Sequence, residues 1–157
     1  MGLWVEIVTL LIPGFNDSDD ELQQLTEFLA SVSADLPWHV TAFHKDYKMT
    51  DPADTKPKDL LRAVEHGQRA GLRYIYAGNL PGRVGSHEDT HCHHCGTMLI
   101  QRFSYQIVDY RLTAEGKCPN CSASVPGRWA ARFGGQIASR PFLPRRTSGL
   151  VTIQNRR

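Results

Sequence analysis

The chain has 157 residues, of which 41% are hydrophobic and 22% charged, a composition that fits one globular domain and excludes collagen-like, fibrous and disordered chains. The net charge of +2 is uneven, because the 42 residues after Glu115 contain one Lys, seven Arg and no acidic residue. The longest apolar run, residues 7–12, is far shorter than the roughly 20 residues that cross a bilayer, and the first residues lack the basic start of a signal peptide, so we expect no membrane segment and a cytoplasmic location.

The first predicted element is a strand over residues 3–12. It is almost continuously apolar and rich in Val, Ile and Thr, which favours a parallel strand buried on both faces. Pro13 and Gly14 end it, and Ser18 to Glu21 then has the spacing of a capping box. An amphipathic helix should follow, because apolar residues recur every three or four positions at Leu22, Leu25, Leu29 and Val32.

Two more strands and a second helix complete the first half. We expect a strand over residues 38–44 that leads into a polar loop, and another over residues 72–77. Between them, Pro57 opens a helix that Gly71 ends, with an inward stripe at Leu60/Leu61, Val64 and Gly67 or Gln68. The β-α-β-α-β order predicts a right-handed parallel sheet, with ligands bound beyond the carboxyl ends of its strands.

All four cysteines occur in two C-x2-C pairs, Cys92 with Cys95 and Cys118 with Cys121. Two such pairs enclose one tetrahedral ion, zinc or rubredoxin-type iron, and a hairpin over residues 98–112 would bring the pairs together. Because four thiolates leave no open coordination position, we expect a structural site and not a catalytic one.

Other chemistry for this region is also open. Two local disulfides or a redox-active dithiol are alternatives, although neither needs two matched pairs. One histidine could replace a thiolate, although exposure to solvent is the simpler expectation for each of His87, His91, His93 and His94. We therefore expect an α/β unit at 1–84, a four-cysteine ribbon at 85–128 and a basic tail at 129–157.

Four segments resemble a known enzyme family. They are IPGFND at 12–17, PWHV at 37–40, FHKDYKM at 43–49 and YIYAGN at 74–79. Followed by paired C-x2-C motifs, this order is similar to the radical S-adenosylmethionine enzyme of the AmmeMemoRadiSam system, which is related to pyruvate formate-lyase activating enzymes. The resemblance covers residues 3–129.

The resemblance implies a partial (β/α) barrel in which a 4Fe-4S cluster, held by an N-terminal C-x3-C-x2-C motif, cleaves S-adenosylmethionine to a radical. That motif is absent here, and three strands cannot close a barrel that usually needs about 250 residues. The chain therefore resembles the C-terminal part of such an enzyme, a barrel fragment followed by a zinc-ribbon or rubredoxin-like module. We expect it to be inactive alone, with no catalytic residue, and with S-adenosylmethionine and 4Fe-4S only in the complete enzyme.

The same resemblance implies cofactor-binding residues and a partner. His44 would lie beside S-adenosylmethionine, and Asn16 and Asp17 would border the opening of the same cofactor site. The simpler alternatives are that His44 caps its strand and that Asn16 and Asp17 only start the helix. The first strand should be an unprotected sheet edge. An N-terminal half in trans, a second copy of the chain or the returning tail could cover it.

A second possible function is a nucleic-acid or protein binding module. The ribbon and the Arg-rich tail would form one basic surface, with Trp129, Phe133 and Phe142 as stacking groups. The small net charge and the generic nature of metal ribbons argue against a nucleic-acid partner.

Overall fold

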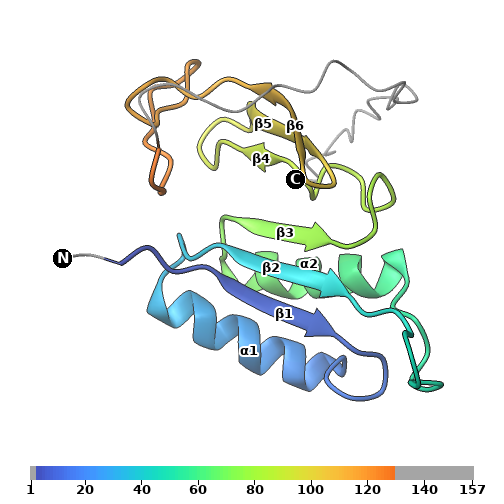
Figure 1. Ribbon diagram of the computed structural model, residues 1–157. Helices are drawn as coiled ribbons and strands as arrows, with labels where there is room; N and C mark the ends of the chain where they lie inside the picture. The colour runs from blue at the N-terminus through green and yellow to red at the C-terminus, as the bar shows by residue number, and fades with distance from the viewer. Residues whose placement is uncertain (1–2, 130–157) are drawn as a thin grey trace, which may run out of the picture.

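The structure, a computed structural model, describes residues 3–129 as a parallel α/β layer and an antiparallel ribbon (Figure 1). The α/β layer contains β1 (Ile7–Leu11), α1 (Asp19–Val32), β2 (Trp38–Ala42), α2 (Pro57–Ala70) and β3 (Ile75–Gly78). The ribbon contains β4 (Thr90–His91), β5 (Met98–Phe103) and β6 (Gln106–Tyr110). Over the residues described, no helix has the length and apolar character to cross a membrane.

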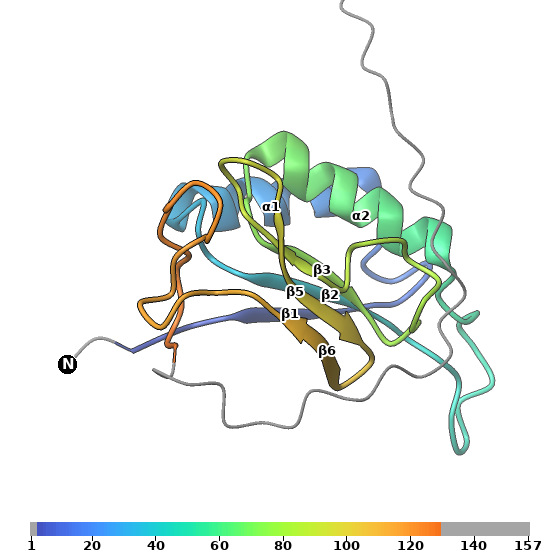
Figure 2. The same cartoon turned by 90° about the horizontal axis from the view of Figure 1, so that it is seen from above.

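The strands of the α/β layer lie side by side in chain order. β2 pairs in parallel with both β1 and β3, with Ile7 opposite Trp38 and Trp38 opposite Ile75. Both helices lie on the same side of this sheet (Figure 2). We call the side without helices the inner face.

The inner face corrects the prediction for the first strand. β1 is only five residues long and its exposure alternates, with Val8 67% and Leu10 44% exposed, so it is not buried on both faces. The reason is that helices cover only one side of the sheet. β2 and β3 are also shorter than predicted: β2 ends at Ala42, and β3 begins at Ile75.

Helix α1 begins where the sequence predicts. Ser18 is its N-cap and forms the expected capping box with Glu21. Leu22 and Leu29 are buried, but Val32 is 61% exposed, which contradicts the predicted stripe. Val32 comes ten residues after Leu22, which places its side chain about 80° around the helix axis from the buried Leu22 side chain.

Helix α2 also keeps its predicted ends, with Pro57 at the start and Gly71 in a left-handed C-cap at φ 96°. Its buried positions include Leu60, Val64 and Gly67, whereas Gln68 is exposed. A Cβ on Gly67 would lie 2.7 Å from Ile75 Cδ1 and 3.1 Å from the Trp38 ring, so a larger residue here would require the end of the Ile75 side chain and the Trp38 ring to shift.

Each part of the molecule has its own hydrophobic cluster. The cluster of the α/β layer includes Leu11, Leu22, Trp38, Leu60 and Val84. The cluster of the ribbon includes Leu99, Ile100, Cys92, Cys118 and, from the segment before β3, Tyr74. The predicted hairpin is confirmed, since β5 and β6 pair in antiparallel fashion. The tail expected beyond Trp129 lies outside the described residues.

Candidate metal centre and the cleft beside it

The four cysteines gather at one end of the ribbon. Their sulfur atoms all lie within 4.8 Å of one another, with 3.5 Å between the sulfurs of Cys92 and Cys121 and 3.6 Å between those of Cys95 and Cys118. A tetrahedral ion with metal-sulfur bonds of about 2.3 Å needs sulfurs about 3.8 Å apart. These four thiols therefore form a metal-binding site for one ion.

Two matched turns present the four sulfurs. In the first turn, the Cys92 N–H donates to Thr97 O and the Gly96 N–H donates to Cys92 O, each at 2.9 Å. The second turn repeats both bonds at 2.9 Å through Cys118, Ser122 and Ala123. Gly96 and Ser122 are the small residues that the sequence predicts for tight turns, and both have left-handed backbones, with φ of 72° and 60°. Each turn thus holds one pair of sulfurs close together.

The thiols of this cluster differ in acidity. Hydrogen bonds, first of all from the Thr97 side chain, lower the pKa of Cys95 to about 5. A backbone hydrogen bond from Ala123 favours the Cys121 thiolate, but desolvation and the neighbouring thiols outweigh it and raise the pKa of Cys121 to about 12. Because the thiolates repel one another, full ionisation of the cluster requires a cation, which is the role of a bound metal.

Histidines lie around the cluster but do not join it. Among the described residues, the only group close enough to hold a metal consists of the four cysteines. His93 instead lies beside Tyr74, with 2.9 Å between its Nδ1 and the phenol oxygen. Desolvation by burial lowers the pKa of His87, so this side chain favours the neutral form. The Tyr74–His93 hydrogen bond links the metal-binding end of the ribbon to the α/β layer.

A cleft of about 440 Å³ opens between the inner face of the sheet and the ribbon. Side chains from all three parallel strands line it on one side, and the β5–β6 hairpin lines it on the other. Its lining includes Glu6, Val8, His39, Tyr76, Glu88, Arg102 and Tyr105.

A row of polar contacts, which we call the polar seam, crosses from the sheet to the ribbon along this cleft. The Glu6 carboxylate lies 2.8 Å from His39 Nε2, and the His39 ring stacks on Tyr76 with centroids 4.9 Å apart. The Tyr76 hydroxyl lies 3.0 Å from Thr90 Oγ1, which accepts a 2.7 Å hydrogen bond from Arg102 Nη1.

Hydrogen bonding and burial set the protonation states of the acidic groups in the seam. Partial burial raises the pKa of Glu6, but hydrogen bonds from Trp4 and His39 outweigh it and hold that pKa below its usual value. Burial raises the pKa of Tyr76, so its hydroxyl stays protonated at neutral pH. The seam therefore presents a carboxylate at one end and a guanidinium at the other.

The predicted residues Asn16 and Asp17 bind their own loop. The Asn16 side chain accepts a hydrogen bond from Ile12 N at 2.8 Å and donates to Leu10 O at 3.0 Å. Asp17 accepts from Gly14 N at 2.7 Å and also pairs with an arginine of α2 at 3.1 Å. Their side chains fix the loop that follows β1.

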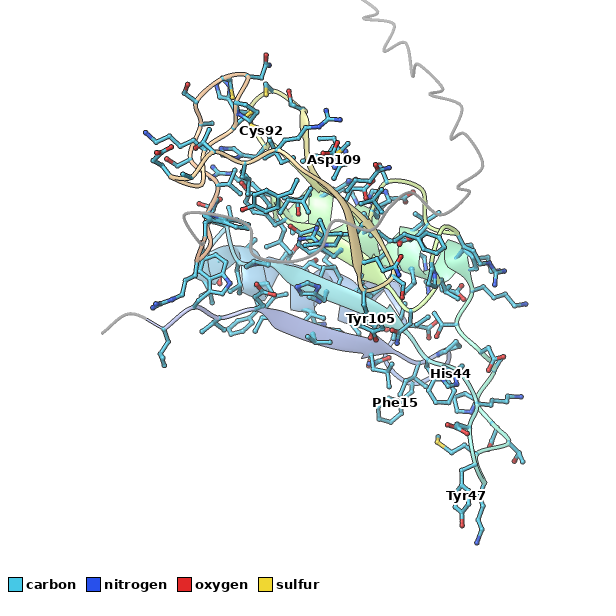
Figure 3. All side chains as sticks on the ribbon, turned by 45° about the horizontal axis from the view of Figure 1, so that its top comes forward. Phe15, His44, Tyr47, Cys92, Tyr105 and Asp109 are labelled. Atoms are coloured by element: carbon cyan, nitrogen blue, oxygen red, sulfur yellow. The ribbon has the colours of Figure 1, made fainter. Side chains whose placement is uncertain are left out.

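The predicted residue His44 is exposed two residues beyond the end of β2. Its Nδ1 lies 3.3 Å from Lys45 O. Figure 3 shows His44 and Phe15 at the same end of the molecule, past the carboxyl ends of the strands. Asn16, Asp17 and His44 do not line the 440 Å³ cleft.

The sequence did not predict the cleft. Alternation along β2, with Trp38 and Val40 on the helix side, could have placed His39 on the inner face. Nothing in the sequence marked Arg102. Trp129, named as a stacking group for a nucleic-acid partner, packs against the ribbon cluster and donates to Val125 O at 2.8 Å. The other expected stacking groups, at 133 and 142, lie outside the described residues.

Comparison with known proteins identifies a longer relative. The chain is 35% identical over 127 residues to the Uncharacterized protein MJ0808 of Methanocaldococcus jannaschii. The matched segment is 80% of this chain but 38% of the relative, so the chain spans well under half of that protein's length. No protein-family description and no solved structure matches the chain. A segment homologous to this chain therefore occurs within a longer protein.

Proposed function

We propose that this chain acts as the C-terminal part of a radical S-adenosylmethionine enzyme of the AmmeMemoRadiSam kind and does not generate a radical by itself. The supporting observation is the winding of the α/β layer. β1, β2 and β3 step across the sheet in chain order, with both helices on one face. Right-handed β-α-β units that step in one direction close a barrel when they continue, whereas a doubly wound sheet reverses direction and carries helices on both faces.

The free edge of the sheet supports the same proposal. Within residues 3–129, β1 pairs only with β2, so its other edge presents unpaired backbone groups. Val8 and Leu10 are exposed beside that edge. An N-terminal half of the barrel, supplied in trans, would pair with β1, and self-association through the same edge is the alternative.

We assign the four-cysteine site to one structural zinc or iron ion. Four thiolates complete a tetrahedron, so no position stays open for water or substrate. A 4Fe-4S cluster is larger than a single ion and needs more widely spaced sulfurs than these, which all lie within 4.8 Å. The sequence contains only these four cysteines. We therefore assign no step of S-adenosylmethionine cleavage to this chain.

In the complete enzyme, the cluster and S-adenosylmethionine supply the radical chemistry. This chain would contribute one wall of the cofactor site at the carboxyl ends of its strands. His44 is the side chain proposed to face the cofactor, because it is exposed there. Asn16 and Asp17 would shape the neighbouring loop through their hydrogen bonds.

The longer relative and this chain allow a matched test. Both are reconstituted anaerobically with iron and sulfide, then incubated with S-adenosylmethionine and a strong reductant. We expect a 4Fe-4S spectrum and 5′-deoxyadenosine from the relative and neither from this chain. Elemental analysis of this chain as purified should find about one zinc or iron ion.

Two results would contradict the proposal. If the reconstituted relative shows neither the cluster nor 5′-deoxyadenosine, the enzyme class is wrong. If this chain alone forms a 4Fe-4S cluster and cleaves S-adenosylmethionine, the four cysteines have been assigned to the wrong role.

A further inference from the structure

We propose that the 440 Å³ cleft binds a small organic anion, with an apolar body and a carboxylate or phosphate group, through the Arg102 guanidinium. This inference does not depend on the proposed function, because it rests only on the side chains that line the cleft in this chain.

Arg102 differs from other arginines of the molecule in its partners. Arg62, Arg73 and Arg111 each form an ion pair with an aspartate at 2.7 to 3.1 Å. Among the ion pairs of residues 3–129, none joins the half-buried Arg102 guanidinium to a carboxylate within 4.0 Å. Its backbone N–H donates to the Asp89 carboxylate at 2.8 Å, and its charge helps to lower the pKa of Glu6 from farther away. A half-buried cation without an ion-pair partner has lost hydration that an anion would replace.

Neutral groups hold the Arg102 guanidinium in place. Its Nη1 donates to the hydroxyl of Thr90, a residue that is only 2% exposed. The guanidinium carbon lies 5.5 Å from the centre of the Tyr76 ring. These contacts orient the planar group without cancelling its charge, which is the arrangement that recognition of a carboxylate or phosphate requires.

Two carboxylates also line the cleft, but both already have donors. The oxygens of Glu88 accept from Gly82 N at 2.6 Å and from Ser104 N at 3.3 Å. The Glu6 carboxylate lies against His39 at 2.8 Å. Because these acids are bound to protein donors, neither forms an ion pair with Arg102 within 4.0 Å, although the Arg102 charge acts on Glu6 from farther away.

The rest of the lining suits an apolar body. Val8 and Tyr105 are 67% and 96% exposed, and both line the cleft from opposite sides. Figure 3 shows Tyr105 at the tip of the β5–β6 hairpin, beside the parallel sheet. The cavity volume lies within the range of about 300 to 1,000 Å³ that small-molecule sites occupy. An anion with a ring or short chain would cover these two exposed side chains.

The test uses three probes with the same apolar ring: benzoate, phenyl phosphate and benzylamine. Each is titrated into the isotope-labelled full chain while NMR follows the Arg102 side-chain N–H and the amides of Val8 and Tyr105. We expect saturating shifts with benzoate, phenyl phosphate or both, and the stronger binder identifies the preferred anionic group. Benzylamine, which carries the opposite charge, should bind at least about tenfold more weakly.

Matched variants locate the site. Arg102→Gln should weaken binding of the anion at least about tenfold, and Arg111→Gln, which removes an exposed arginine of the ribbon, should leave it unchanged. The proposal is overturned if neither anion gives saturating shifts, if benzylamine binds as well as the anions, or if Arg111→Gln weakens binding as much as Arg102→Gln. The probe comparison uses the unmodified chain, so the result stands even if Arg102→Gln fails to fold.

Discussion

The α/β layer and the ribbon are stabilised by different interactions, although they have a similar number of strands. In the α/β layer, two helices bury large apolar side chains such as Trp38, Leu22 and Leu60 against one sheet face. In the ribbon, two of the cysteines are themselves members of the buried cluster, next to Leu99 and Ile100. We therefore expect the small core of the ribbon to need a metal to fold and the α/β layer to fold through the packing of its apolar side chains.

The largest expected effect follows from removing a metal ligand. Cys118→Ser should release the ion and unfold the ribbon, because a structural zinc site contributes roughly 10 kcal/mol or more of folding free energy. The α/β layer should stay folded. Metal content and hydrogen exchange, measured separately over β5–β6 and over α1, test this expectation.

His94→Ala is the control for that variant. His94 is exposed and lies between two cysteines of the first turn region. The His94→Ala variant should keep the metal at full occupancy, since the site consists of four thiols. Loss of the ion from His94→Ala, or full metal in Cys118→Ser, would refute the four-thiolate site.

The converse change removes packing from the α/β layer. Leu60 is fully buried, so Leu60→Ala should lower the unfolding free energy of this layer by about 2 to 5 kcal/mol. The ribbon should retain its metal. Urea unfolding monitored by far-ultraviolet circular dichroism, which reports the two helices of this layer, gives the free energy. Leu61→Ala on the half-exposed neighbouring position should cost clearly less. Equal loss of metal and of α/β structure in Leu60→Ala would show that the two regions form one cooperative unit.

A smaller effect is expected at the contact between the two regions. The hydrogen bond between Tyr74 and His93 is 2.9 Å long, and Tyr74→Phe should reduce ribbon stability by about 1 kcal/mol. Burial, the largest cause, raises the pKa of the Tyr74 phenol, so the bond should persist at alkaline pH. His93→Ala should have a similar effect, and the double variant should lose no more than either single one. Additive losses would mean that the two side chains act independently.

The smallest effect compares the two metal-binding turns. Ser122 has a left-handed backbone at the position that Gly96 occupies in the first turn. Ser122→Gly should stabilise the metal-bound ribbon by up to about 1 kcal/mol, because glycine adopts this conformation without steric cost. Gly96→Ala should lower the stability of the metal-bound ribbon. Thermal unfolding of the metal-bound chain measures both, and a loss of stability in Ser122→Gly would show that its side chain contributes more than the backbone strain costs.

Local signals account for the parts of the structure that the sequence predicted. Ser18, Pro57 and Gly71 act within a few residues of chain, so the helix ends could be located without knowledge of the packing. The paired cysteines likewise carry their own geometry, because each C-x2-C turn places two sulfurs together. The metal-binding site therefore follows from spacing alone.

Predictions that depended on which elements pack against a strand or helix were less accurate. The apolar run at residues 3–12 was expected to be buried on both faces, but what covers each face depends on where the two helices pack. The failure at Val32 has the same origin, since the last turn of α1 extends past the buried stripe. In each case, hydrophobicity identified the element but not the surface that it faces.

The sequence by itself determined the β-α-β-α-β order, the two helix starts and the four metal ligands, because these depend on residues close together in the chain. Only the tertiary structure decided that the inner face of the sheet meets the ribbon and that Arg102 reaches the Tyr76 ring across that boundary. Those two residues are far apart in the sequence and belong to different sheets. Thr90, which precedes the first metal-binding turn, forms a hydrogen bond with each of these two side chains. The three residues lie in three different strands, so no local sequence pattern could predict that they meet.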